Sequence, residues 1–308
     1  MREGRGIELS RELQLRGIIT ALITPFTKTG EVDEAALGEV VEFQIRSRVH
    51  GLFPLGTTGM GPAMEADERK RVAERVIKLV NGRIPVIIQV GAADPLVSLE
   101  LARHAEKVGA DAVACLTPFY YHPTAGSVVE HYKRLSDATK LPILAYNIPS
   151  NTGNNVDAKL LLEISKIPRV VGIKDSSRDF SQLLDYLTTL PDNFTVVNGA
   201  DTYLFSAFCA GVRAGVSAAA NAFPDLYVQM YEAYKAEDFV KGAELQRKIF
   251  VLRKATETPT IAPLYEVLRM RGIRPGYVRP PLRELTPVEV ESLHATVSRL
   301  MPELKVAA

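Results

Sequence analysis

Short apolar runs alternate with longer amphipathic segments along most of the chain. Continuously apolar runs predict strands that are buried on both faces, and eight of them occur, at Gly17–Leu22, Gly51–Leu55, Pro85–Val90, Ala112–Leu116, Pro142–Tyr146, Val170–Ile173, Phe194–Val197 and Gly215–Ala218. Between the runs, apolar residues recur with the spacing of a helix, at Glu34–Ile45, Glu65–Val80, Ser98–Val108, Ser127–Ala138, Ala158–Ile164 and Phe180–Leu187.

Alternation of strands and helices predicts a parallel sheet built from repeated βα units. Right-handed crossovers keep every helix on the outside, so eight units can close into a (β/α)8 TIM barrel. The competing architecture is an open doubly wound sheet, but no Gly-x-Gly-x-x-Gly motif follows the first predicted strand. The 308 residues suit a barrel of about 250 residues with an appended segment.

The pattern changes after Pro224, where only helical spacing remains. Helices are expected at Asp225–Tyr234, Phe239–Val251, Pro259–Arg271 and Pro287–Met301. Residues 1–224 are therefore expected to form the barrel that carries the active site, and residues 225–308 a C-terminal helical extension.

Composition and charge narrow the class of protein. Hydrophobic residues make up 46% of the chain and charged residues 24%, which are values typical of a globular fold. A net charge of +1 provides no basic field for nucleic acid or an anionic membrane, and no apolar segment approaches the length of a membrane span. Cys115 and Cys209 stand in apolar surroundings and are expected to be core thiols of a cytoplasmic protein. The histidines lack zinc-site spacing, so no metal is expected.

Lys174 is the first candidate for chemistry. It closes the apolar run Val170–Ile173, where burial disfavours the charged form of an amine. A neutral lysine beside a carbonyl substrate can form a Schiff base that withdraws electrons from the neighbouring carbon. A lysine that merely reaches water from the strand end is the alternative explanation.

Other strand ends carry polar residues, and in a βα barrel these ends line the active site. The second strand ends in Gly56-Thr57-Thr58-Gly59, whose backbone amides and hydroxyls can hold a carboxylate. The fourth ends near Tyr120, the fifth at Tyr146 and the seventh at Gly199. A phenol close to a lysine can transfer protons, although a tyrosine at a strand end is often only part of the wall.

With these features the chain resembles the pyruvate-dependent class I aldolases and lyases grouped around dihydrodipicolinate synthase and N-acetylneuraminate lyase. The resemblance covers nearly the whole chain. The motifs that carry it are Thr24-Pro25-Phe26, Gly56-Thr57-Thr58-Gly59, Pro118-Phe119-Tyr120-Tyr121, Tyr146-Asn147-Ile148-Pro149, Gly172-Ile173-Lys174-Asp175 and Ala218-Ala219-Ala220-Asn221.

The resemblance implies a role for each matching residue. Lys174 would form the imine with the keto carbon of pyruvate, and Tyr146 would transfer protons. Thr58 would link Tyr146 to Tyr120, which in family members reaches across a subunit contact of a homotetramer built from two dimers. The resemblance implies no cofactor. The substrate-binding residues would be Thr57, Thr58, Asn151, Gly199 and Val216.

Departures from the family pattern bear on the substrate. Dihydrodipicolinate synthases typically read Tyr-Asn-x-Pro-x-Arg-Thr-Gly, and Asn151 stands here in place of the arginine. A neutral amide cannot make the charge-assisted contact that a carboxylate would use. The segments Gly56–Pro62, with Met60, and Gly276–Pro281 instead resemble archaeal 2-keto-3-deoxygluconate aldolases. We therefore expect reversible cleavage of 2-keto-3-deoxy sugar acids to pyruvate and a hydroxyaldehyde such as glyceraldehyde.

Other functions remain open. The main alternative is 4-hydroxy-tetrahydrodipicolinate synthase, which condenses pyruvate with aspartate semialdehyde, because an arginine from elsewhere in the chain could replace the missing one. The same lysine also suits the dehydration of a keto-deoxy sugar acid or the cleavage of 4-hydroxy-2-oxoglutarate. A function from a different class is that of a non-catalytic oligomer that binds pyruvate as a signal.

Overall fold

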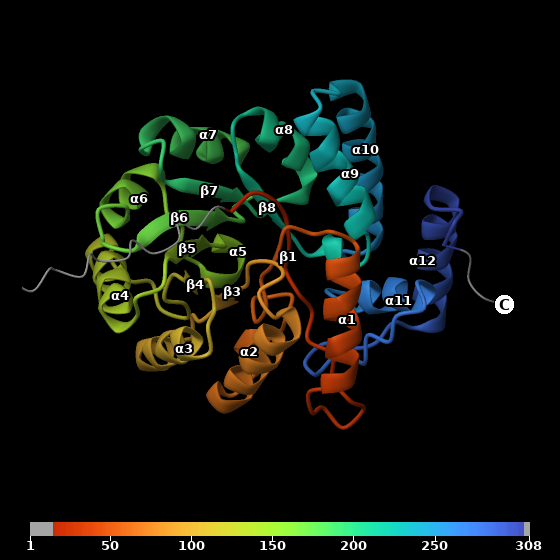
Figure 1. Ribbon diagram of the computed structural model, residues 1–308, viewed down its shortest axis with the longest axis horizontal. Helices are drawn as coiled ribbons and strands as arrows, with labels where there is room; N and C mark the ends of the chain where they lie inside the picture. The colour runs from red at the N-terminus through yellow and green to blue at the C-terminus, as the bar shows by residue number, and fades with distance from the viewer. Residues whose placement is uncertain (1–14, 305–308) are drawn as a thin grey trace, which may run out of the picture.

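The computed structural model describes residues 15–304, which form one parallel barrel with helices around it (Figure 1). Neighbouring strands pair in the order β2-β1-β8-β7-β6-β5-β4-β3. A parallel bridge between Leu52 and Val86 joins the two ends of this order, so the sheet closes. This arrangement confirms the predicted (β/α)8 TIM barrel. The strands are β1 (Gly17–Thr20), β2 (Gly51–Leu52), β3 (Ile87–Gln89), β4 (Ala112–Leu116), β5 (Ile143–Asn147), β6 (Val170–Asp175), β7 (Thr195–Asn198) and β8 (Ala214–Ser217).

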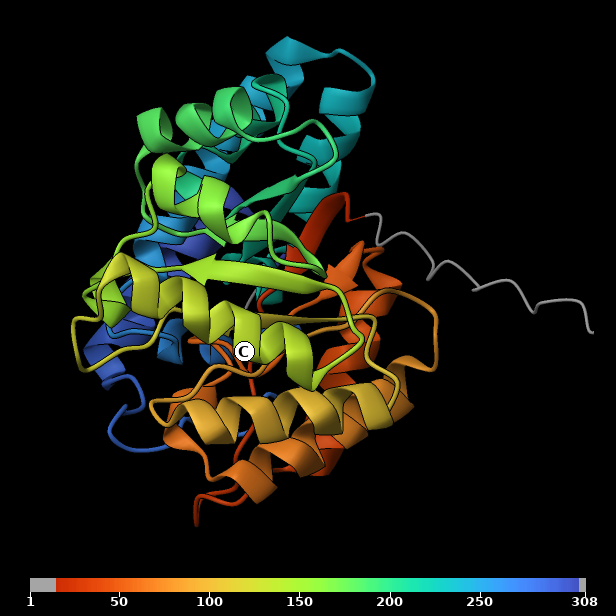
Figure 2. The same ribbon diagram turned by 90° about the vertical axis from the view of Figure 1, so that its left-hand side faces the viewer.

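Helices surround the strands, and Figure 2 shows α3 and α4 covering them on one side. Aspartate side chains cap several of these helices, as where Asp33 accepts a hydrogen bond from the backbone N–H of Ala36 at 2.9 Å. The helices are α1 (Glu34–Arg46), α2 (Ala66–Val80), α3 (Pro95–Lys107), α4 (Ala125–Ala138), α5 (Pro149–Thr152), α6 (Ala158–Ile164), α7 (Phe180–Thr189) and α8 (Leu204–Cys209). Single 3₁₀ turns η1 (Gly61–Ala63), η2 (Asp201–Tyr203) and η3 (Ala219–Asn221) follow β2, β7 and β8.

Three local features differ from the sequence-based expectation. The run Gly51–Leu55 was expected to be one strand, but β2 ends at Leu52 because Pro54 has no N–H and Leu55 turns the chain with φ 64°. Helices α5 and α8 were not expected, since neither is long enough to show a helical period. Cys115 is buried as expected, whereas Cys209, at the end of α8, is exposed.

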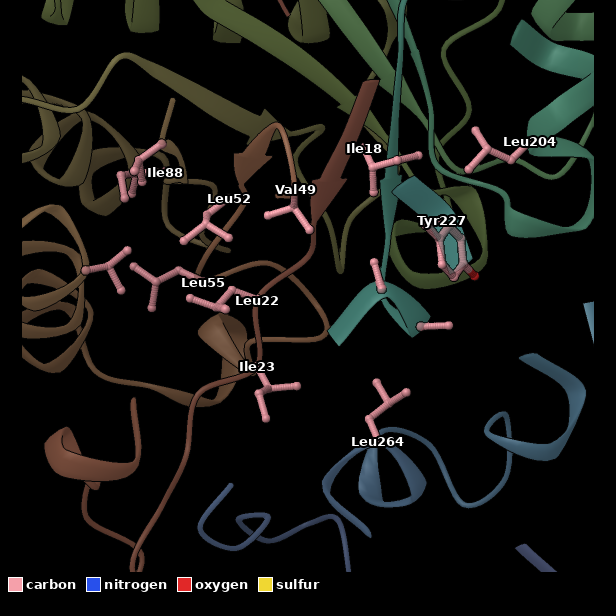
Figure 3. Packing of buried hydrophobic residues seen from close by; sticks show 14 of the residues in the cluster. Ile18, Leu22, Ile23, Val49, Leu52, Leu55, Ile88, Leu204, Tyr227 and Leu264 are labelled. Carbon is pink, nitrogen blue, oxygen red and sulfur yellow. The ribbon is translucent and has the colours of Figure 1, made fainter. Parts of the chain in front are cut away.

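The core has two layers, and strand alternation assigns each side chain to one of them. Ile19, Leu144 and Tyr146 belong to the cluster inside the barrel. Ile18 and Ala145 belong to the cluster between strands and helices. Figure 3 shows part of this outer layer, including Ile18 of β1, Leu52 of β2, Ile88 of β3, Leu204 of α8 and Tyr227 of α9.

The C-terminal helices lie on one side of the barrel, at the right of Figure 1. Helix α9 contacts β1 and α8, and α10 contacts α8 and η2, so the helical part is packed directly on the barrel. The division at residue 224 remains a proposal. Helix α11 begins at Ala262, later than the expected Pro259, because Ile261 has φ 73°. These helices are α9 (Pro224–Lys235), α10 (Phe239–Ala255), α11 (Ala262–Met270) and α12 (Pro287–Leu300).

Candidate active site

Lys174 lies near the end of β6 with only 4% of its surface exposed. Its Nζ atom is 3.8 Å from the centroid of the Tyr146 ring and 4.1 Å from that of Phe53. Within residues 15–304 it forms no salt bridge and no hydrogen bond. The amine is therefore held by two aromatic faces, with no carboxylate beside it to stabilise a charge.

Tyr146 is placed opposite Lys174 by strand pairing. The two residues are partners in the β5–β6 register, and both side chains point into the barrel. The Tyr146 ring meets Phe53 edge-on at 5.7 Å between centroids. Packing thus fixes the Tyr146 ring next to the amine, and a phenol held close to a lysine is a candidate for proton transfer.

A cavity of about 360 Å³ opens above these two side chains. Its walls come from the carboxyl ends of β5, β6 and β8, the loops after β2 and β7, and helices α5, α10 and α11. This is the end of a βα barrel that carries active sites. The cavity brings together all but one of the predicted site residues, namely Thr57, Thr58, Tyr146, Asn151, Lys174, Gly199 and Val216.

The two threonines lie in a tight loop after β2. A side chain at Gly61 would overlap the carbonyl oxygen of Leu55, so the loop can fold this closely only with glycine there. The hydroxyl of Thr24 donates to the carbonyl of Gly59 at 2.8 Å and holds the loop against the end of β1. Thr58 is buried, and in the described part of the chain its hydroxyl forms no hydrogen bond with either tyrosine predicted to partner it.

Gly199 brings the end of β7 close to the segment after Lys174. Its backbone N–H donates to the Asp175 carbonyl at 2.6 Å, and a Cβ here would overlap the Ser176 hydroxyl. Val216 faces the same space from β8 and is buried. These two residues shape the wall near the lysine.

Tyr120 is the predicted site residue that does not line the cavity within this chain. It is 83% exposed, has φ 77° and packs edge-on against Tyr121 at 5.2 Å between centroids. Its role in the site therefore remains a proposal that requires a second copy of the chain. Asn151, by contrast, reaches the cavity from α5, and its side-chain oxygen accepts a hydrogen bond from Ser150 at 3.0 Å.

Two arginines that the sequence did not single out also line the cavity. Arg253 of α10 forms a two-pronged contact with Glu257 at 2.8 and 3.1 Å. Arg178, from the loop after β6, lies 3.6 Å from the same carboxylate. Two guanidinium groups share the Glu257 carboxylate, so the two arginines retain donor groups that this one carboxylate does not occupy. Arg178, only four residues after Lys174, could have been suspected from sequence, whereas Arg253 reaches the site only through helix packing.

Asp201 lines the same wall and is unusual among its carboxylates. Burial raises its pKa to about 6, although Ser217, Arg253, Tyr227 and Arg178 act in the opposite direction. Its Oδ1 atom is sealed from solvent without a hydrogen-bond partner in the described residues. Such a group holds a proton far more readily than an ordinary aspartate.

The described residues contain no group of three or more histidine, cysteine, aspartate or glutamate side chains arranged to hold a metal ion. None of the helices in this part of the chain is long and apolar enough to cross a membrane.

Comparison with known proteins gives a consistent result. The model of the dihydrodipicolinate synthetase family matches residues 14–300. A 4-hydroxy-tetrahydrodipicolinate synthase of Methanopyrus kandleri is 36% identical over 299 residues, covering 94% of this chain and 98% of the relative.

Solved structures agree with the sequence match. YagE, a prophage protein of E. coli K12 crystallised in complex with pyruvate, superimposes with a TM-score of 0.90 at 27% identity, covering 92% of this chain and 98% of YagE. A monomeric dihydrodipicolinate synthase variant gives a TM-score of 0.88 at 33% identity, covering 93% and 97%.

Proposed function

The chain belongs to the dihydrodipicolinate synthetase family, and we propose that it condenses pyruvate with an aldehyde through an imine at Lys174. The family consists of class I aldolases and lyases that act through a lysine Schiff base, and the protein is an enzyme of this class. The observation that carries the proposal is the buried amine of Lys174 at the floor of the cavity, against the Tyr146 ring and without a polar partner among residues 15–304.

In the proposed reaction the amine of Lys174 attacks the keto carbon of pyruvate, and water leaves as the imine forms. Loss of a proton from the methyl carbon then gives an enamine, whose carbon attacks the aldehyde. Cleavage of a 4-hydroxy-2-keto acid runs the same steps in reverse. We assign the protons of these steps to Tyr146, and its strand pairing with Lys174 supports this acid–base role.

The pyruvate carboxylate is proposed to sit on the loop of Thr57 and Thr58. Both line the cavity, and backbone N–H groups with hydroxyls suit a small anion. YagE, crystallised in complex with pyruvate and similar over most of this chain, supports pyruvate as the ligand.

For the aldehyde we propose aspartate semialdehyde, which makes the protein a 4-hydroxy-tetrahydrodipicolinate synthase. Several similar curated proteins carry that name. Arg178 and Arg253 also supply, from other parts of the chain, the positive charge that Asn151 lacks. A guanidinium that retains a free edge can bind the carboxylate of such an aldehyde.

A second candidate is the cleavage of 2-keto-3-deoxy sugar acids. Asn151 favours it, because an amide suits the hydroxyl groups of a neutral hydroxyaldehyde better than a carboxylate. Purified protein with pyruvate and either aspartate semialdehyde or glyceraldehyde decides between the two. A higher kcat/KM for the semialdehyde supports the synthase, and a higher value for glyceraldehyde supports the sugar-acid aldolase.

Assembly and location complete the proposal. We propose a homotetramer in which Tyr120 of one copy approaches the cavity of another, consistent with its exposure and left-handed backbone. A cytoplasmic location likewise remains a proposal. Sedimentation of the wild-type protein tests the assembly, and a monomer at assay concentration would overturn this part.

A further inference from the structure

A hydrogen-bonded pair lies directly behind the two proposed catalytic residues. Asn147 follows Tyr146 on β5, Asp175 follows Lys174 on β6, and the two are partners in the strand register. The Nδ2 group of Asn147 donates to Oδ1 of Asp175 at 2.8 Å. Both side chains are fully buried.

Strand alternation places the pair on the outer face of the barrel wall, opposite to the cavity. Neighbours confirm this, because Ala145 and Ile173 pack in the layer between strands and helices. Neither Asn147 nor Asp175 lines the cavity. The pair therefore acts on the reaction only through the positions of its chain neighbours.

Each member of the pair is held from other sides as well. The Asn147 oxygen accepts from the backbone N–H of Val156 at 3.1 Å, and its amide also donates to Asn155 at 2.9 Å. The second Asp175 oxygen accepts from the Ser177 hydroxyl at 2.7 Å. Among the described residues no lysine, arginine or histidine pairs with Asp175, so its partners are neutral donors.

Burial of the Asn147 and Asp175 side chains costs folding free energy unless their hydrogen bonds are made. Burial raises the pKa of the Asp175 carboxyl, while its bonds from Ser177 and Asn147 act the other way. Two apolar residues could fill the same space without this cost, as Ala145 and Ile173 do one residue earlier in the same layer. The polar pair differs from an apolar pair because a hydrogen bond is directional. A bond between two fixed partners opposes a shift of one strand along the other.

We infer that Asn147 and Asp175 are positioning residues that lock the register of Tyr146 against Lys174. This inference rests on the proposed imine function. A displacement of about 1 Å between a proton carrier and its reacting atom can lower the rate about a hundredfold. Breaking the pair should therefore lower the rate of proton transfer and leave imine formation possible.

The test measures two steps separately. Pyruvate and borohydride report imine formation at Lys174, and exchange of the pyruvate methyl protons in D₂O reports proton transfer through the enamine. Asn147→Ala and Asp175→Ala each remove one partner of the bond between the strands, and each should lower exchange, per trappable Lys174, by about tenfold to a hundredfold. Asn155→Ala is the matched control, because it loses a bond to Asn147 and leaves the bond between strands intact.

Reversal of the pair provides a rescue. Asn147→Asp alone places one carboxylate opposite another. Asn147→Asp combined with Asp175→Asn restores one donor and one acceptor across the two strands. The double variant should therefore recover much of the exchange rate. These isosteric variants also carry the test if Asn147→Ala does not fold. Exchange within twofold of wild type in the single variants, an equal loss in Asn155→Ala, or no rescue by the reversal would overturn the inference. Failure of wild-type protein to be trapped at Lys174 would instead overturn the proposed function.

Discussion

The Nζ atom of Lys174 lies 3.8 Å from the centre of the Tyr146 ring, and the two residues are directly paired between β5 and β6. The contact joins a candidate nucleophile to a candidate proton carrier through backbone pairing rather than through a flexible loop. Sites on strands are held more precisely than sites on loops. Because the two side chains are held together, substitutions at either residue should affect the same steps of the proposed reaction.

Replacing Tyr146 with phenylalanine should separate packing from chemistry. The ring against Lys174 and Phe53 remains, but the hydroxyl that carries protons is lost. Methyl proton exchange of pyruvate should fall by about 10²–10⁴-fold, the usual contribution of general acid–base catalysis. Exchange at the wild-type rate in Tyr146→Phe would show that the Tyr146 side chain lines the cavity without transferring protons.

Thr58→Val should weaken both pyruvate binding and turnover, because it removes a buried hydroxyl at nearly constant volume. Steady-state kinetics with pyruvate as the varied substrate measures the effect as a higher KM and a lower kcat. Thr188→Val, at an exposed site on α7, is the control and should behave as wild type. Equal kinetics for the two variants would remove Thr58 from the site.

Charge on the cavity wall should set the preference for the aldehyde. Asn151→Arg should raise kcat/KM for aspartate semialdehyde relative to glyceraldehyde by about tenfold to a hundredfold, since a hydrogen bond to a charged group is worth about 1.5–3 kcal/mol. Arg178→Ala should shift the ratio in the opposite direction, because it removes a guanidinium from the wall. If neither substitution moves the ratio, the distal end of the substrate does not contact this wall.

Asp201 should make stability depend on pH in the acid range. Burial raises its pKa to about 6 from an ordinary value of 3.8, so the folded protein binds this proton more tightly than the unfolded chain. The stabilisation of the folded state by the protonated Asp201 carboxyl is complete below about pH 4 and is lost as the pH rises through about 6. Asp201→Asn stays neutral, so the Tm of the variant should rise relative to wild type between these pH values. Asp192→Asn, at an exposed site, should show no such trend, and an equal trend in both would contradict the assignment.

The sequence was sufficient to predict the barrel and the position of Lys174 and Tyr146 at its mouth. Apolar runs show where each strand ends, and the active site of a βα barrel lies at these strand ends. It was insufficient where position depends on packing between distant elements. Arg253 and Glu257 reach the cavity only because α10 packs on α8 and η2. Asn147 and Asp175 are part of the motifs noted in the sequence. Their hydrogen bond depends on the register between β5 and β6, which no local sequence pattern predicts. The role proposed for Tyr120 depends on a second copy of the chain, which the sequence of one chain does not describe.

Trapping with pyruvate and borohydride tests the central claim most directly. Wild-type protein should lose activity irreversibly and gain the mass of one reduced pyruvate per chain, located at Lys174 by peptide mass spectrometry. Lys174→Ala should gain nothing, and Lys174→Arg should be equally inert because a guanidinium stays protonated. Label on another lysine, or unlabelled protein that remains active after the same treatment, would contradict imine chemistry at Lys174.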